Sequence, residues 1–392
     1  MSKMMDTYAR QPVTFEKGEG VWLWTKDGKK YLDALSGVAV NGLGHSHPKL
    51  IKAINEQISR LIHVSNVYHI AEQEKLAEKL TSIAHMDNAF FCNSGCEANE
   101  AAIKLARLYG HQNGIDTPEI IVMEKAFHGR TMATLSATGN RKTQAGFEPL
   151  VGGFIRVAFD DLEAIQQIAS RKNNVVAILV EPIQGEGGIN IPSNMQNYLK
   201  GLREICDQHH WLLMLDEVQS GIGRTGKWFA HQHTAIHPDV MTLAKGLGSG
   251  VPIGACLARA KASKVFTPGK HGSTFGGNPL ATAAGYATLK IIEEDKLCSH
   301  ASKMGTLINE EFSKHLKDCP QVRVIRNLGL MIGIELDQPC GDLTKLALDQ
   351  GLLINVTADK VIRLLPPLVI NEAEAKELVE RLSQVIKNFL AK

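Results

Sequence analysis

The pattern of hydrophobic and polar positions begins with a hairpin and continues as a regular alternation. At the N-terminus, Asp27-Gly28 separates the apolar runs at residues 21–24 and 31–32, which predicts a tight β-hairpin. From about position 50, helical segments alternate with short apolar runs at residues 89–91, 120–122, 175–180, 211–215 and 240–244. Such strands between helices are typical of a mostly parallel sheet with helices on both faces.

The C-terminal third has a different pattern. The segment GGNP at residues 276–279 ends the alternation before an alanine-rich helix, and apolar runs follow at residues 322–325, 331–336 and 361–365. These runs predict strands of a smaller α+β section. A capping box of Asn371 and Glu374 is expected to begin the last helix, whose apolar residues share one face, namely Leu378, Leu382, Val385 and Phe389.

We therefore predict an α/β chain with a large and a small domain. A length of 392 residues exceeds what one simple core accommodates. We expect residues 1–48 to form an N-terminal segment of the small domain and residues 49–280 the large, cofactor-binding domain. Residues 281–392 are expected to complete the small domain.

Composition and charge exclude several classes of function. The hydrophobic content of 44% and charged content of 21% are those of a globular protein. A net charge of +2 creates no strong field toward nucleic acid or an anionic membrane, and no apolar run is long enough to span a bilayer. The N-terminus lacks a signal-peptide core, and seven scattered cysteines without a Cys-x-x-Cys pair indicate reduced thiols in a cytoplasm.

Two polar segments follow apolar runs at the strand ends, where ligands of parallel sheets bind. Ser94-Gly95-Cys96 precede a helical run, and the free N–H groups of a helix N-terminus suit a phosphate. Taken alone, this segment is better explained as an ordinary turn capped by Ser94. Asp216 ends the run at 211–215, and a buried carboxylate needs a partner, which is either a structural cation or a bound cofactor or metal.

Lys245 ends the run at 240–244 and enters the glycine-rich loop at 246–250. Most lysines are solvated, but burial lowers the pKa of an amine from about 10.4 and makes it a nucleophile suited to Schiff-base chemistry. A phosphate site, a carboxylate and such a lysine together fit pyridoxal phosphate (PLP). Phe127 either stacks on the ring of this cofactor or packs in the core.

The sequence at these residues resembles the class III, ornithine-aminotransferase-like PLP aminotransferases. The resemblance runs over nearly the whole chain, and six segments in order carry it: NSGCEANEAAIKLAR, AFHGRT, VEPIQGEGG, LLMLDEVQSGIGRTG, TLAKGLGSG and GSTFGGNPL. It implies a fold-type I (aspartate-aminotransferase-like) homodimer whose active site lies at the subunit interface.

The resemblance also implies roles for individual residues. Lys245 matches the lysine that binds the cofactor covalently, and Asp216 matches the partner of the ring nitrogen. The other expected cofactor contacts are Ser94, Gly95, Cys96, Phe127, Glu217, Val218, Gln219 and, given to the neighbouring subunit, Thr274. Cys96 stands where relatives often carry Thr, and because a thiol is a weak donor, its backbone N–H is the expected phosphate contact.

Four residues are expected to bind substrate. Arg130 and Arg363 resemble the arginines that bind substrate carboxylates, a task that suits the guanidinium fork. Glu186 resembles the residue that pairs with Arg363 when no dicarboxylate is bound, and Ser273 resembles a substrate contact. No metal site is expected.

The reaction implied by the resemblance moves the distal amine of N-acetylornithine to 2-oxoglutarate, as in arginine biosynthesis. Ornithine, succinylornithine, succinyl-diaminopimelate and 4-aminobutyrate are alternative donors. Val38, where ornithine enzymes tend to carry an aromatic residue, favours an acylated donor. A PLP-dependent aminomutase is a further alternative. A P-loop hydrolase is disfavoured, because Trp228 stands where the motif at 221–227 needs Ser or Thr.

Overall fold

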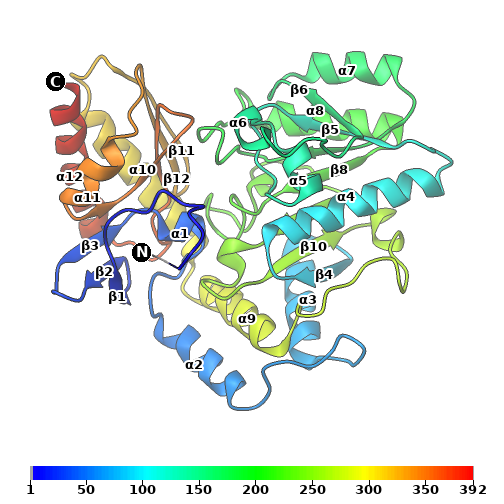
Figure 1. The fold of residues 1–392 in the computed structure, drawn as a ribbon, viewed down its shortest axis with the longest axis horizontal. Coiled ribbons are helices and arrows are strands. Elements are labelled where there is room, and N and C mark those ends of the chain that lie inside the picture. Colours follow the sequence, from blue (N-terminus) through cyan, green and yellow to red (C-terminus); the bar gives the residue numbers. More distant parts are fainter. Residues whose placement is uncertain (1–2, 392) are drawn as a thin grey trace.

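The computed structural model describes residues 3–391, and a seven-stranded sheet forms the centre of its larger part (Figure 1). The strands are arranged in the order β4 (Asn88–Cys92), β10 (Gly254–Ala258), β9 (Val240–Leu243), β8 (Leu212–Asp216), β7 (Val175–Val180), β5 (Glu119–Met123) and β6 (Phe154–Val157). Only β10 runs against its neighbours β4 and β9, and the pairs from β9 to β6 are parallel. The predicted mostly parallel sheet is confirmed.

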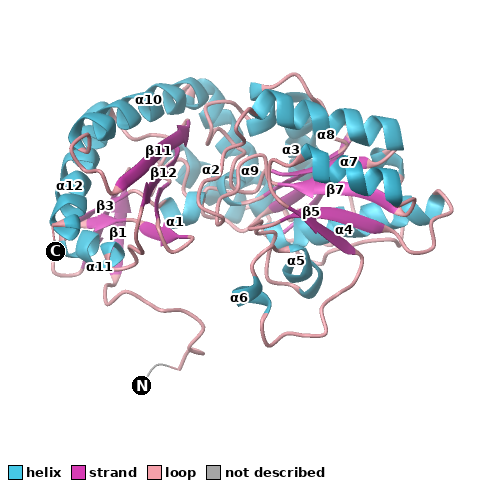
Figure 2. Ribbon diagram, turned by 90° about the horizontal axis from the view of Figure 1, so that it is seen from above, coloured by secondary structure: helices cyan, strands magenta, loops and turns pink. Residues whose placement is uncertain are grey.

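Helices cover both faces of this sheet, as Figure 2 shows. Helices α7 (Leu162–Arg171) and α8 (Met195–His209) lie on one face, and α4 (Gly95–Gln112), with α5 (Met132–Ala137) and α6 (Arg141–Gln144), lies on the other side. Alternate residues of β5 enter different cores: Ile120 packs with the α4 side and Ile121 with the α8 side. Burial on both faces explains why these strands are continuous apolar runs.

The smaller part combines segments from the two ends of the chain. The strands β11 (Val322–Leu328), β12 (Met331–Leu336), β15 (Val361–Leu364) and β14 (Asn355–Thr357) form an antiparallel sheet. The N-terminal strands β1 (Phe15–Glu19), β2 (Trp22–Thr25) and β3 (Lys30–Asp33) form a second sheet, in which β3 pairs in parallel with β13 (Leu352–Leu353). The hairpin predicted at Asp27-Gly28 is confirmed, with Gly28 at φ +83°. The domain boundaries at 48 and 280 stay a prediction.

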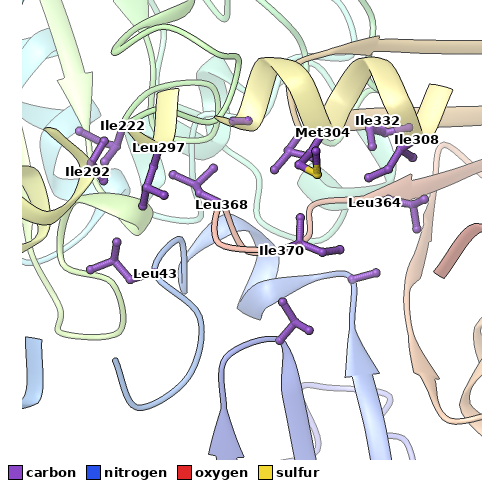
Figure 3. Packing of buried hydrophobic residues seen from close by; sticks show 14 of the residues in the cluster. Leu43, Ile222, Ile292, Leu297, Met304, Ile308, Ile332, Leu364, Leu368 and Ile370 are labelled. Atoms are coloured by element: carbon purple, nitrogen blue, oxygen red, sulfur yellow. The ribbon is translucent and has the colours of Figure 1, made fainter. Parts of the chain in front are cut away.

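The remaining helices pack in two groups. Helices α2 (Pro48–Ile58), α3 (Ala71–Ala84) and α9 (Pro279–Glu294) pack together, and α1 (Ser36–Ala39) precedes them. Helix α10 (Leu297–His315) packs with α12 (Glu372–Leu390), and α11 (Leu343–Asp349) contacts α12. Figure 3 shows Met304 and Ile308 of α10 close to Ile332 and Leu364 of the antiparallel sheet.

Local signals in the sequence account for several boundaries. The capping box of Asn371 and Glu374 at the start of α12 is confirmed. The predicted burial of Leu378, Leu382 and Val385 is confirmed as well.

The hydrophobic pattern missed two strands of the seven-stranded sheet, because β10 consists mostly of small residues (GACLA) and β6 is a four-residue edge strand that contains an arginine. It also missed the short strands β1, β13 and β14. Within residues 3–391, no helix combines the length and apolarity needed to cross a bilayer.

Candidate active site

Loops that follow neighbouring strands line a cavity of about 360 Å³. Because parallel strands end at the same edge of a sheet, residues distant in sequence meet there. The lining includes most of the predicted cofactor residues, namely Ser94, Gly95, Cys96, Phe127, Asp216, Val218, Gln219 and Lys245. A volume of this order is typical of a site for an organic cofactor or ligand.

Lys245 occupies a conformation that an ordinary lysine rarely adopts. It begins the short 3₁₀ turn η2 (Lys245–Leu247) just after β9, and its φ of 43° lies in the left-handed region, which is strained for a residue with a β-carbon. Burial lowers the pKa of its amine, and the nearby charge of Arg363 lowers it further, against the opposing effect of three carboxylates. The neutral, nucleophilic form of the amine is therefore favoured.

Asp216, at the end of β8, is buried among hydrogen-bond donors. Its Oδ2 accepts a bond of 2.7 Å from Asn99 Nδ2 and lies 2.7 Å from His128 Nδ1, and its Oδ1 accepts from the Val218 N–H at 3.1 Å. The structural alternative, a Lys or Arg partner, is not found among residues 3–391, where His128 forms the only ion pair with Asp216. The carboxylate is thus poised to pair with a cation in the cavity.

The N-terminus of α4 supplies hydrogen-bond donors to the lining of the cavity. Ser94 caps this 18-residue helix, since its hydroxyl accepts from the Glu97 N–H at 3.2 Å. The N–H groups of Gly95 and Cys96 lie in the first turn, where no helical carbonyl can pair with them, and the helix dipole favours an anion there. A β-carbon at residue 95 would lie 2.7 Å from Val218 Cγ1, so glycine is needed for this close approach.

The predicted pairing of Arg363 with Glu186 is present. Arg363 extends from β15 and is only 1% exposed. Its Nη1 donates to Glu186 Oε1 at 2.7 Å and to Gln219 Oε1 at 3.3 Å, and its Nε donates to Asn355 Oδ1 at 3.1 Å. The smaller part of the molecule thus delivers a buried cation to the cavity edge, where its charge is neutralised by a carboxylate.

Arg130 lies outside the inner cavity. Its exposed guanidinium is 5.8 Å from the centre of the Phe127 ring. It lines an outer hollow of about 520 Å³ that shares Phe127 and Glu186 with the inner cavity. A substrate that enters by this hollow would pass Arg130 before it reaches Lys245.

Besides Arg130 and Arg363, three predicted residues do not line the inner cavity, namely Glu217, Ser273 and Thr274. The carboxylate of Glu217 accepts bonds from Ser220 Oγ at 2.6 Å and from the Ala230 and His231 N–H groups at 2.9 Å, which is a structural network behind the site. The predicted cofactor contact of its side chain therefore has no support in this geometry. Ser273 and Thr274 lie in a loop beyond the lining, with Thr274 exposed.

Sequence reasoning missed three buried residues of the site, namely Asn99, His128 and Glu181. The Oδ1 of Asn99, on α4, accepts a hydrogen bond from the Thr242 hydroxyl at 2.7 Å. Its Nδ2 donates to Asp216 and, at 2.8 Å, to the His128 carbonyl. Glu181 accepts from the N–H groups of Phe127 at 2.9 Å and Gly185 at 3.0 Å. The signal for Glu181 was available, because it directly follows a fully buried strand, as Asp216 does.

The geometry of the cavity agrees with comparisons to known proteins. The family model of class III aminotransferases matches residues 4–386. This chain belongs to the class III aminotransferases. It is a PLP-dependent enzyme, and the lining fits that cofactor: first-turn N–H groups face the space for a phosphate, Asp216 suits a protonated ring nitrogen, and Lys245 suits an aldehyde. No group of three His, Cys, Asp or Glu side chains within residues 3–391 could hold a metal ion.

Individual relatives align with this chain over its whole length. It is 63% identical to the acetylornithine aminotransferase of Nitrosomonas europaea over 100% of this chain and 99% of the relative. It is 47% identical to the acetylornithine aminotransferase of Aquifex aeolicus, over 100% of both chains.

Solved structures of aminotransferases confirm the fold. The ornithine aminotransferase of Toxoplasma gondii ME49 superposes with a TM-score of 0.95 at 33% identity, over 99% of this chain and 93% of the other. The acetylornithine aminotransferase of Elizabethkingia anophelis gives a TM-score of 0.88 at 38% identity, over 98% and 96% of the two chains. The predicted fold-type I architecture of this class III aminotransferase is therefore correct.

Glu181 generates a prediction about pH. The pKa of its carboxyl is raised from 4.5 to about 7, mainly by burial; the charge of His128 opposes this rise and that of Asp216 adds to it. Between these two pH values the folded protein binds more protons at Glu181 than the unfolded chain does, so this residue makes folding less favourable as pH rises. We expect the unfolding free energy of the wild type, relative to Glu181→Gln, to fall by up to about 1.4 kcal/mol per pH unit in this window.

Urea unfolding of both cofactor-free proteins at several pH values measures this difference. The difference should level off above the folded-state pKa, where both states of the wild type are ionised. A difference that stays constant from pH 5 to pH 7.5 would show that Glu181 has an ordinary pKa.

Proposed function

We propose that this enzyme transfers the distal amino group of N-acetylornithine to 2-oxoglutarate. The products are N-acetylglutamate 5-semialdehyde and glutamate. The observation that carries the proposal is the Arg363–Glu186 pair at the edge of the Lys245 cavity. It provides an arginine for the second carboxylate of 2-oxoglutarate, and a carboxylate that neutralises this arginine when the donor presents only one carboxylate and a distal amine.

Sequence similarity supports the acetylated donor over free ornithine. The chain is 63% identical to a protein named acetylornithine aminotransferase and 33% identical to the ornithine aminotransferase of T. gondii. The fold alone does not separate the two groups, since its TM-score is higher with the latter. Val38 lies close to the cavity-lining Val40 and packs with Leu35 and Ile189, which leaves an apolar surface rather than an aromatic side chain in this loop.

The catalytic roles follow from the chemistry of the cavity. When bound, PLP supplies an aldehyde that receives the amino group and a protonated ring that accepts electrons from the carbon bearing it. Asp216 keeps the ring nitrogen protonated by pairing with it. Lys245 Nζ, whose pKa is lowered by burial, would take the proton from the carbon that bears the amino group and return a proton to the cofactor carbon.

We assign cofactor contacts to the residues that line the inner cavity. Gly95 and Cys96 hold the phosphate through their N–H groups, Phe127 and Val218 hold the two faces of the ring, and Gln219 lies near its hydroxyl. Ser94 contributes by capping α4, so that the first-turn donors keep their direction.

We assign the substrate carboxylates to two arginines. Arg363 binds the second carboxylate of 2-oxoglutarate after Glu186 has moved away, and Arg130 binds the single carboxylate of the amino donor. Both suit bidentate pairing with a carboxylate.

We further propose a cytoplasmic homodimer. The segment at 58–68 lies against the loop that holds Ser273 and Thr274, since Asn66 Nδ2 donates to the carbonyls of Ser273 at 3.0 Å and Gly276 at 2.9 Å. Large apolar side chains are exposed around this contact, namely Ile58, Leu61, Ile62, Val67, Tyr68 and Phe275. Such a patch suits a subunit interface, across which Thr274 would reach the phosphate and Ser273 the substrate of the partner. The seven cysteines are free thiols, in keeping with a reducing compartment.

A panel of amino donors with 2-oxoglutarate tests the substrate proposal. We expect kcat/KM for N-acetylornithine to exceed that for ornithine and 4-aminobutyrate by at least about 10-fold, which corresponds to about 1.4 kcal/mol of transition-state binding. Succinylated donors belong in the panel. A preference for free ornithine would contradict the proposal, and turnover without any glutamate formation would indicate an aminomutase.

The pairing of Glu186 with Arg363 generates a second prediction. Glu186→Gln leaves the buried guanidinium without a countercharge when a donor with one carboxylate is bound, whereas glutamate supplies its own. We expect the ratio of kcat/KM for N-acetylornithine to that for glutamate to fall about 10-fold, a loss of about 1.4 kcal/mol.

Asp359→Asn is the matched control for Glu186→Gln. Asp359 is an exposed carboxylate of the outer hollow and pairs with Lys142 instead of Arg363. This control should leave the donor ratio within twofold of the wild type. An equal fall in both variants would show a general effect of charge at the entrance, and no fall in Glu186→Gln would refute the specific role of the pair.

A further inference from the structure

Helix α4 holds the loop that carries Arg130 by two side chains one helical turn apart. The Arg130 N–H donates to Cys96 Sγ at 3.2 Å. Glu100 Oε1 accepts from the Thr131 hydroxyl at 2.5 Å and from the Thr134 N–H at 3.3 Å. Positions four apart lie on the same face of a helix, so these two side chains hold the loop at Arg130 and directly after it.

The loop backbone lies directly against the thiol. Gly129 has a φ of +140°, and a β-carbon there would lie 2.5 Å from Cys96 Sγ and 2.6 Å from Thr134 Oγ1. The hydroxyls of Thr131 and Thr134 are 2.7 Å apart, which closes the turn that begins α5. The thiol therefore faces the loop closely enough to determine the path of its backbone.

The position of the Arg130 guanidinium depends on that backbone. Its side chain is exposed, and no carboxylate within residues 3–391 forms an ion pair with it. Its ring contact is with Phe127, from the same loop, at 5.8 Å. Without an anchor at its far end, the side chain is directed by the place where its own backbone is held.

We propose that Cys96 and Glu100 are positioning residues, which hold Arg130 at a set distance from the phosphate-binding end of α4. In this arrangement the thiol accepts a hydrogen bond from the Arg130 N–H, and it is not a ligand of the cofactor phosphate. Cys96 and Glu100 thus act on recognition of the donor carboxylate. The inference rests on the proposed role of Arg130 in binding that carboxylate.

Two pairs of variants test the proposal. Cys96→Ala and Glu100→Ala remove an acceptor, whereas Cys96→Thr and Glu100→Gln retain one. The two alanine variants should raise KM for the amino donor about 3- to 10-fold with little change in kcat, the range expected for the loss of one hydrogen bond. The conservative variants should stay within about twofold of the wild type, as should the control Lys104→Gln, which lies on α4 and contacts His271 instead of the loop.

Two readouts do not depend on activity. Titration of the cofactor-free protein with PLP should give a Kd unchanged within twofold in all variants. Hydrogen–deuterium exchange of the peptide 127–134 should be faster in the two alanine variants, and should return to the wild-type rate in Cys96→Thr.

Each contrary outcome has a distinct meaning. A raised Kd for PLP with an unchanged donor KM in Cys96→Ala would make the thiol a phosphate ligand and overturn the proposal. An unchanged donor KM and unchanged exchange in the alanine variants would also overturn it. Arg130→Gln distinguishes a failure of this proposal from a failure of the proposed function of Arg130. If Arg130→Gln leaves the donor KM unchanged, Arg130 does not bind the donor carboxylate, whatever the effects of the Cys96 and Glu100 variants.

Discussion

The removal of the Lys245 amine from water is the constraint on which the rest of the site depends. The strand β9 carries the chain into the interior, and the left-handed turn at Lys245 directs its side chain into the cavity. Burial there disfavours the charged form of the amine, and the nearby Arg363 reinforces the effect. A lysine on the surface would stay protonated at neutral pH and could neither attack an aldehyde nor take up a proton.

The charged groups of the site are arranged around this amine. Asp216 is held by donors from Asn99 and Val218 and lies against His128, so a buried negative charge is stabilised where a ring nitrogen can pair with it. Glu181 lies close enough for repulsion from Asp216 to contribute to its raised pKa. Arg363 would repel a cationic donor, but Glu186 neutralises it. The cavity can thus bind first a donor with one carboxylate and then an acceptor with two.

Much of this architecture is readable from the sequence, for physical reasons. Strands buried on both faces are continuous apolar runs, so β5, β7, β8 and β9 are recognisable, and the residues that end β8 and begin the turn after β9 belong to the site. Strand β10 was not predicted, because its mostly small residues give only a weak hydrophobic pattern. The carboxylate of Glu217 bonds a network behind the site, unlike that of Asp216, and one sequence does not show which of two adjacent residues at a strand end faces the cavity.

The sequence does not predict the contacts between segments that lie far apart along the chain. Nothing in the spacing of Asn99, Asp216 and Thr242 shows that they form one hydrogen-bonded chain. The contact of Cys96 with the Arg130 N–H likewise depends on the packing of α4 against the following loop. The roles proposed for Ser273 and Thr274 would depend on contacts across a subunit interface, which the spacing of residues within one chain does not reveal.

The central claim concerns one lysine, and chemical mapping tests it most directly. Sodium borohydride makes the bond between a lysine amine and an aldehyde permanent, so the protein is reconstituted with PLP, reduced, digested and analysed by mass spectrometry. The account predicts a single phosphopyridoxyl group, located on Lys245. Stoichiometric labelling of a different lysine, or no labelling of Lys245 while the cofactor remains tightly bound, would contradict it.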